Sequence, residues 1–144
     1  MNIILFSSLL VFTLAYSLWR GDRDARIAAM ICVMATLFTH VLMSTRLQPY
    51  QSVERGVLMI DVATLTAFIG LALVSSRFWP LWIAGLQLTA SSSHLIKLID
   101  ESLVPLAYAV AERFWGYPIL LIIAIGAYRA HRRERRAMAR LSKA

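Results

Sequence analysis

The sequence predicts an all-α fold, a polytopic membrane helical bundle of five transmembrane helices with a short interfacial helix before the last. Three observations predict it. Hydrophobic residues make up 59% of the 144 residues and charged residues only 16%, whereas soluble domains contain roughly 45–50% apolar and about 25% charged residues. Five apolar runs are separated by short polar connections, and most of the net positive charge lies near one end of the chain.

A hydrocarbon core of ~30 Å requires about 20 apolar helical residues. The first two apolar runs end at charged segments that begin with Arg20 and Arg46. Only residues 77–79 separate the third run from the fourth, which predicts a tight antiparallel hairpin. Pro80 suits the first turn of the fourth helix, because its missing N–H has no partner there. We expect the spans at residues 2–19, 27–45, 56–76, 80–99 and 114–130.

The fifth apolar run, residues 114–128, is shorter than a span requires. In one geometry, an interfacial helix over residues 102–113 precedes a separate spanning helix that the basic tail completes. In the other, residues 103–129 form one tilted helix kinked at Pro118. We favour the first, because the Gly-Tyr-Pro sequence ending at Pro118 punctuates the chain.

The charge distribution predicts an orientation. We interpret residues 1–130 as one transmembrane domain and residues 131–144 as a basic cytoplasmic tail. With the N-terminus outside, eleven Lys and Arg residues lie on the cytoplasmic side and four on the other. The positive-inside rule then favours an outer N-terminus and an inner C-terminus. The first apolar run lacks the positive n-region of a signal peptide, so we expect a retained membrane helix.

Four ionisable residues fall inside the predicted spans, and three of them lie at one depth. His40, Asp61 and His94 each lie five residues from the outer end of a span, which places them about 7–8 Å below the outer boundary. Lys97 lies almost one turn beyond His94. Because ionisable groups inside a membrane usually face protein or water, we expect these four residues to form a candidate polar cluster.

The cluster has several interpretations. In the structural one, Asp61 and Lys97 pair while the histidines form interhelical hydrogen bonds, which average ~0.6 kcal/mol. In the functional ones, His40, Asp61 and His94 relay a proton or bind a quinone-like head group, or the two histidines ligate haem. Because single histidines carry no spacing motif, we expect no cofactor and no metal, with haem as the alternative.

Other sequence features limit the function. The single cysteine, Cys32, excludes an internal disulfide and a cysteine zinc site. We find no nucleotide-binding, hydrolase or metalloprotease motif, and a chain of this length cannot hold several membrane spans and a separate catalytic domain of ~100–150 residues. We therefore lean away from an enzyme and expect a non-catalytic accessory or scaffold subunit. The alternative is a small transporter or redox component that uses the polar cluster.

Small residues predict how the third and fourth helices pack. Gly85, Thr89 and either Ser92 or Ser93 recur at four- and then three- or four-residue spacing, and Ala63 and Ala67 offer a matching face. Such stripes let helices approach closely.

The arginine-rich end predicts a lipid contact. A polybasic run directly after a span is attracted to anionic inner-leaflet lipid at ~1 kcal/mol per residue. We expect this lipid as a partner, together with other membrane subunits or a second copy of the chain, and no nucleic acid, because no recognition module is visible. The candidate lipid-binding residues are Arg129, Arg132, Arg133, Arg135 and Arg136.

One group of residues carries a family resemblance. The residues are Arg77-Phe-Trp-Pro-Leu-Trp82, Gln87, His94, Tyr108, Tyr117-Pro118 and His131-Arg-Arg. In this C-terminal half the chain resembles small multi-pass inner-membrane proteins of alphaproteobacteria. The resemblance implies a location in a bacterial inner membrane and no particular activity or ligand.

Overall fold

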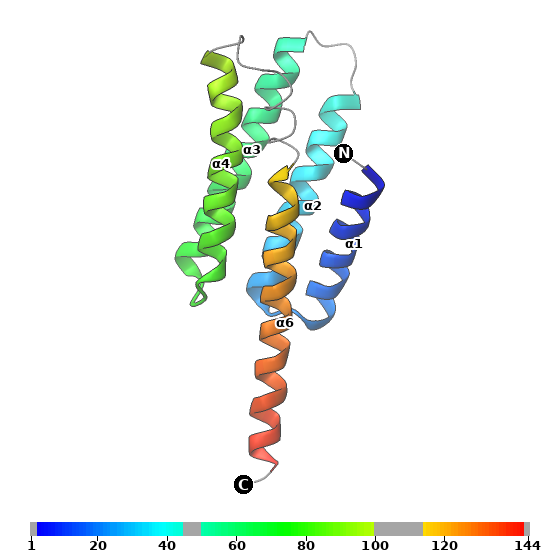
Figure 1. Ribbon diagram of the computed structural model, residues 1–144, viewed down its shortest axis with the longest axis vertical. Coiled ribbons are helices and arrows are strands. Elements are labelled where there is room, and N and C mark those ends of the chain that lie inside the picture. The colour runs from blue at the N-terminus through cyan, green and yellow to red at the C-terminus, as the bar shows by residue number, and fades with distance from the viewer. Residues whose placement is uncertain (1–2, 45–49, 100–113, 143–144) are drawn as a thin grey trace.

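A computed structural model of the protein describes residues 3–44, 50–99 and 114–142, with side chains at 4–44, 56–92 and 114–142. Within these ranges the chain forms five helices and no strand, so the all-α prediction is confirmed there. The predicted interfacial helix lies outside the described residues. The helices are α1 (Ile3–Arg20), α2 (Arg23–Ser44), α3 (Tyr50–Val74), α4 (Trp79–Ile99) and α6 (Gly116–Leu141) (Figure 1).

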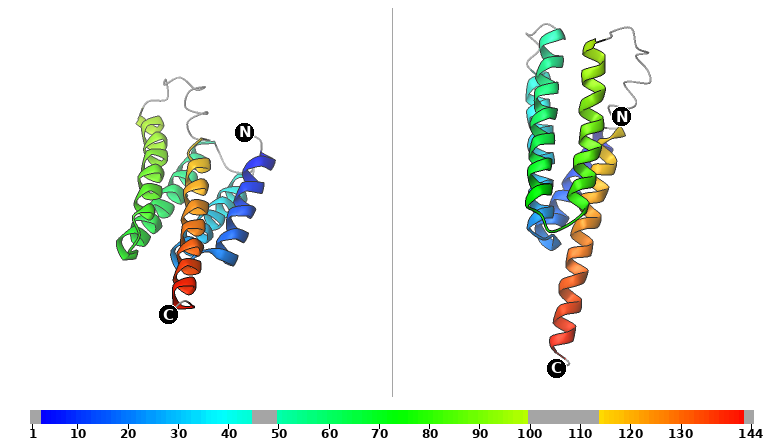
Figure 2. Two further views of the ribbon diagram at one scale, coloured as in Figure 1. Left: turned by 60° about the horizontal axis from the view of Figure 1, so that its bottom comes forward. Right: turned by 90° about the vertical axis from the view of Figure 1, so that its left-hand side faces the viewer.

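The helices form an up-and-down bundle that α6 closes. Each of the first four packs against the next along the chain, and the predicted hairpin of α3 and α4 is confirmed. Helix α6 packs against α1, α2 and α4, so it returns between the first and fourth helices (Figure 2). Its C-terminal half projects beyond the rest of the bundle (Figure 1).

Helix boundaries follow backbone hydrogen bonding more closely than hydropathy. Helix α2 begins four residues before its apolar run, because the Oδ1 atom of Asp22 accepts a hydrogen bond from the Ala25 N–H at 3.1 Å and so caps the first turn. Helix α6 begins at Gly116, which puts Pro118 in the first turn, where a missing N–H is tolerated. From there one helix of 26 residues carries the chain from the apolar segment into the arginine-rich one.

The core lies where α2, α3, α4 and α6 meet. Two adjacent alanines of α2, Ala28 and Ala29, are almost fully buried, and their small side chains let the neighbouring helices approach closely. The large residue at the centre is Phe68, which has no exposed surface. The buried core cluster consists of Ala28, Ala29, Phe68, Leu71, Ile83, Ala84, Ile119 and Ile123.

The predicted packing stripe between α3 and α4 is wrong. Gly85 faces open space, with no atom within 4 Å of where a Cβ would lie, and Thr89 and Ala63 are exposed. Small residues permit close approach on any face, but the burial of the large side chains selects the face that packs. The α3 and α4 residues that are buried instead are Val57, Thr64, Phe68, Leu71, Pro80, Ile83, Ala84, Gln87 and Ser91.

Two helical segments of the described chain are long and apolar enough to cross a membrane. They are Arg23–Ser44 in α2 and Gly56–Val74 in α3. A third segment, Ile4–Arg20 in α1, is apolar but shorter.

The contact between α4 and α6 supplies a stability test. A Cβ at Gly126 would lie 2.9 Å from Cε2 of the Trp79 ring, so replacing Gly126 by Ala forces the indole or the helix to move. We expect Gly126→Ala to lower the free energy of unfolding by about 1–3 kcal/mol, as overpacking of a core does. Reversible unfolding in detergent micelles measures this change.

Gly85→Ala is the matched control, because the same substitution at an open helical position meets no neighbouring atom. It should leave stability unchanged or raise it by up to about 1 kcal/mol through helix propensity. Equal effects of the two substitutions would contradict close packing of Trp79 on α6.

Candidate functional site

The predicted polar cluster is described in part. His40 lies on an exposed face of α2, and Asp61 is half-buried on α3. The amide Nε2 of Gln87 donates a hydrogen bond to Oδ1 of Asp61 at 3.3 Å, which joins α3 to α4. His94 and Lys97 lie on α4, but their side chains are outside the described residues. The structure therefore places Asp61 beside Gln87 and joins α3 to α4 through their side chains.

The described side chains do not assemble a metal centre. Among them, no group of three or more histidine, cysteine, aspartate or glutamate residues is placed to hold a metal ion. Cys32 is half-buried beside the core cluster.

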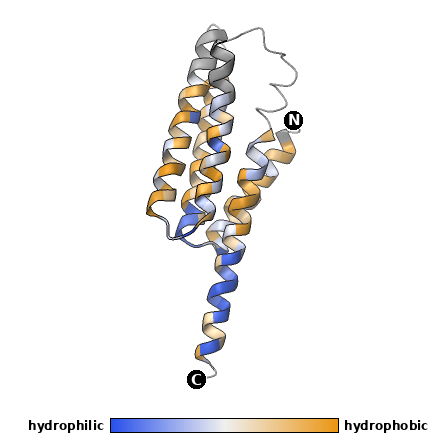
Figure 3. Ribbon diagram, turned by 60° about the vertical axis from the view of Figure 1, so that its left-hand side comes forward, coloured by the Kyte–Doolittle hydropathy of each residue, from blue (hydrophilic) through white to orange (hydrophobic). Residues whose placement is uncertain are grey.

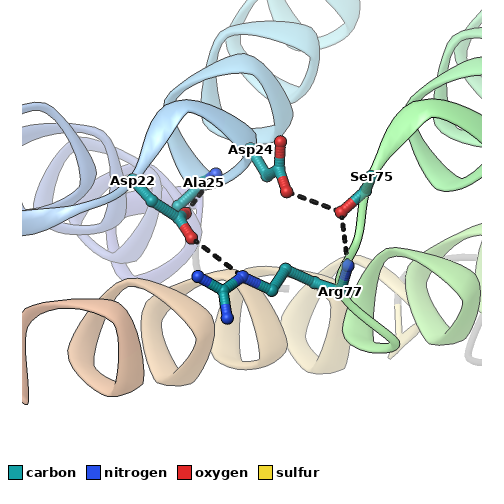
Figure 4. A network of polar contacts seen from close by, with 5 residues as sticks. All are labelled: Asp22, Asp24, Ala25, Ser75 and Arg77. Carbon is teal, nitrogen blue, oxygen red and sulfur yellow. Dashed lines mark hydrogen bonds and ion pairs between the residues drawn. The ribbon is translucent and has the colours of Figure 1, made fainter. Parts of the chain in front are cut away.

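A polar network joins the α1–α2 connection to the α3–α4 connection (Figure 4). Asp22, which caps α2, also places its Oδ2 atom 3.7 Å from Nε of Arg77. The hydroxyl of Ser75 donates to Oδ2 of Asp24 at 2.5 Å and accepts a hydrogen bond from the Arg77 N–H at 3.0 Å. These contacts tie two chain reversals together at the same end of the bundle, so we call Asp22, Asp24, Ser75 and Arg77 the loop network.

A second polar contact joins α1 to α6 at this end. Nη1 of Arg20 lies 2.9 Å from Nε2 of His131. Because a guanidinium can only donate, the imidazole nitrogen accepts, which assigns the proton of a neutral ring to Nδ1. The Arg20 guanidinium also lies 4.2 Å from the centroid of the Trp19 ring. The last turn of α1 is thus linked to the point where α6 becomes basic.

Sequence reasoning missed the loop network. It assigned no partner to Arg77, although Asp22 before the apolar run of α2 carries the signature of an N-cap. The pairing of the two connections depends on how the helices pack, and no local sequence signal encodes it.

An open groove of about 900 Å³ lies between the start of α4 and the middle of α6. One part is lined by aromatic and aliphatic side chains and the other by arginines. Four of the five candidate lipid-binding arginines line this groove, and Arg135 does not. The lining residues are Arg77, Phe78, Trp79, Trp82, Ile122, Ile125, Gly126, Tyr128, Arg129, Arg132, Arg133 and Arg136.

Comparison with known proteins adds no functional assignment. No protein-family model, curated protein or solved structure matches the chain. The resemblance to inner-membrane proteins of alphaproteobacteria therefore stays a prediction.

The double role of Asp22 can be separated by two substitutions. Asp22→Ala removes both the helix cap and the contact with Arg77, and we expect a loss of about 1–2 kcal/mol in unfolding free energy, mostly from the cap. Asp22→Asn keeps a side-chain oxygen for the Ala25 N–H and removes only the charge. Since exposed ion pairs contribute ~0–1 kcal/mol, this variant should lose less.

Thermal or denaturant unfolding in detergent compares the two variants with the wild-type protein. Equal losses for Asp22→Ala and Asp22→Asn would show that the cap contributes nothing and that the whole effect of Asp22 comes from its charge.

Proposed function

We propose that this chain is a small integral protein of a bacterial inner membrane, with five helices that all cross the bilayer, and that it is a non-catalytic accessory or scaffold subunit. The observation that carries the membrane proposal is the low burial of its apolar helices. In the apolar windows of α2 and α3, only 11% and 22% of the residues are buried within the protein. A core helix of a soluble protein would be mostly buried, so these faces require an apolar environment.

The outward-facing side chains support the same proposal. Leu73 and Val74 at the end of α3 are 81% and 82% exposed, and large apolar side chains on the other helices are likewise open. Soluble monomers rarely expose contiguous apolar patches of more than a few hundred Å². Figure 3 shows apolar residues along the bundle and hydrophilic ones concentrated on the projecting half of α6. This separation of apolar from hydrophilic residues is explained if hydrocarbon surrounds the bundle and water surrounds the projecting half of α6.

Helix lengths suit the five-span proposal. The 18 residues of α1 extend about 27 Å, close to the ~30 Å of a hydrocarbon core. The apolar part of α6 is shorter, but its first arginines can extend their side chains to the interface. The loop network and the arginines of α6 belong to the same end of the bundle, which we assign to the cytoplasm by the positive-inside rule.

The scaffold proposal rests on how the polar side chains are used. Ser75, Asp24, Gln87 and Asp61 join helices or connections to one another through hydrogen bonds. Interhelical hydrogen bonds of this kind orient helices in a membrane. The outward apolar faces then remain available to lipid and to other membrane subunits.

The second candidate is a small transporter, or a proton-relay or quinone- or haem-binding component, that uses His40, Asp61, His94 and Lys97. The observation that favours it is the half-buried Asp61 carboxyl group between apolar helices. Ionisable residues in such positions often belong to proton or substrate pathways.

Cysteine labelling tests the topology. In a Cys32→Ser background, single cysteines at the ends of the proposed spans supply reporter positions: Asn2→Cys, which precedes α1, and Ser44→Cys at the proposed outer side, and Ser76→Cys and Ser142→Cys at the inner side. We expect a membrane-impermeant maleimide to label the first two on intact spheroplasts and the last two only after permeabilisation. Carbonate washing should leave the protein in the membrane.

Release by carbonate would refute the membrane proposal itself. Labelling of Ser142→Cys from outside would refute the orientation. Labelling of Asn2→Cys and Ser142→Cys on the same side would require an even number of crossings.

Replacing Asp61 by Asn separates the scaffold from the transporter. The Asn side chain keeps an oxygen that can accept from Gln87, so stability should change by less than about 1 kcal/mol. Under the scaffold proposal, proteoliposomes containing wild-type protein or Asp61→Asn should show the proton flux of empty liposomes, measured with an internal pH dye. A flux that the wild-type protein supports and Asp61→Asn abolishes, with unfolding unchanged, would favour the transporter.

A further inference from the structure

The groove between α4 and α6 has two chemically different parts, and we call it the arginine–tryptophan groove. Its basic part is a row of arginines on α6, and its apolar part is formed by Phe78, Trp79 and Trp82 near the start of α4 with Ile122 and Ile125 of α6. The row continues from the apolar part along the same helix. A ligand that fills both parts must therefore be an amphiphile.

The basic part is a strip on one side of α6. Arg129, Arg132, Arg133 and Arg136 follow one another at intervals of three, one and three residues, a pattern that keeps them on neighbouring positions of a helix face. All four are exposed. In the part of the chain whose side chains are described, none of the four makes a hydrogen bond or an ion pair. The strip thus presents four guanidinium groups to an anionic ligand.

Arg77 adds a fifth guanidinium to the lining from the α3–α4 connection. It also lies 3.7 Å from the Asp22 carboxylate, so its charge is partly compensated. The ion pair holds Arg77 at the edge of the groove. The α6 strip remains the main source of uncompensated positive charge.

The apolar part lies beside the place where α4 contacts α6. Trp79 packs directly on Gly126, where no side chain intervenes. This leaves Trp82, one turn further along α4, 61% exposed, with the Phe78 ring at 6.1 Å in an edge-to-face arrangement. Tryptophan is enriched at membrane interfaces, because its ring is apolar while its N–H is polar. The position of these rings beside the arginines fits the boundary between acyl chains and head groups.

We propose that the arginine–tryptophan groove binds an anionic phospholipid, with its phosphate on the arginine strip and an acyl chain along Trp82, Ile122 and Ile125. The inference rests on the proposed membrane function, and charge complementarity selects the occupant. Guanidinium groups bind phosphate oxygens through paired, charge-assisted hydrogen bonds. Basic pockets between membrane helices on the cytoplasmic side recognise such head groups.

The length of the strip selects among anionic lipids. Arg129 and Arg136 are seven residues apart, which corresponds to about 10 Å along the helix axis. A single phosphate group cannot contact both ends of a strip of that length. A head group with two phosphates can therefore contact more of the strip than a head group with one, and we expect it to be retained more tightly.

Lipid titration followed by native mass spectrometry tests the proposal. The full chain in mild detergent is titrated with tetraoleoyl cardiolipin, which carries two phosphates, with dioleoyl phosphatidylglycerol, which carries one, and with zwitterionic dioleoyl phosphatidylcholine. We expect one tightly retained cardiolipin, weaker phosphatidylglycerol binding and no retained phosphatidylcholine. Arg132→Gln with Arg133→Gln should weaken cardiolipin binding about 30-fold.

The matched control removes the same charge outside the groove. Arg135→Gln with Arg140→Gln lowers the net charge equally, but neither residue lines the groove, so we expect a change of less than about threefold. Trp82→Leu should weaken cardiolipin binding while Trp19→Leu on α1 does not. Circular dichroism and thermal unfolding of each variant verify that the fold is retained.

Several outcomes would overturn the proposal. Equal losses for the two arginine pairs would show that only the overall charge of α6 attracts lipid. Equal retention of phosphatidylcholine would remove the role of the arginines, and binding of a short RNA that cardiolipin does not displace would assign the strip to nucleic acid. A failure of the membrane proposal is recognised separately, because carbonate would then release the protein whatever its lipid affinity.

Discussion

The return of α6 between α1 and α4 is the contact on which the rest of the structure depends. Its residues Ile119 and Ile123 complete the core around Phe68, and Gly126 receives the ring of Trp79. Without this helix, α1 to α4 would form an open row with an unpaired face at each end. With it, the bundle closes, and the transition from apolar to arginine-rich sequence falls beside the aromatic start of α4.

Polar contacts have different tasks at different depths of this bundle. At the end where the chain reverses twice, the loop network and the Arg20–His131 contact connect α1, α2, α6 and the α3–α4 connection. Such partly exposed contacts contribute little individually, but together they restrict how the helices can slide past one another. Deeper in the bundle, the Asp61–Gln87 hydrogen bond restricts sliding between α3 and α4 in the same way. The Asp61 carboxyl group is half-buried there, and the amide of Gln87 satisfies one of its oxygens.

The lateral surface has the opposite character. Small residues such as Ala28 and Ala29 let helices meet closely around the buried Phe68, while many other large apolar side chains on the lateral surface are exposed. In water this arrangement would expose much more apolar area than a small domain tolerates. In lipid it costs nothing, because hydrocarbon solvates those side chains, and helix association then depends on packing and hydrogen bonds. The proposed lipid groove lies at the boundary between hydrocarbon and water, where its apolar part would contact an acyl chain and its arginines a phosphate.

Composition and hydropathy alone determined the all-helical class and the α3–α4 hairpin, since long apolar runs and a three-residue connection leave few alternatives. They also singled out Asp61 and the arginines of α6. The packed face of α4 could not be read from the sequence, because Gly85 and Ala84 are both small, and only the packing of the helices around Phe68 buries Ala84 and leaves Gly85 exposed. The pairing of Arg77 with Asp22, and the meeting of Trp82 with Arg132 at one groove, were likewise decided by tertiary structure. Residues far apart in the chain come together only through helix packing, and local sequence patterns do not indicate which of them will meet in space.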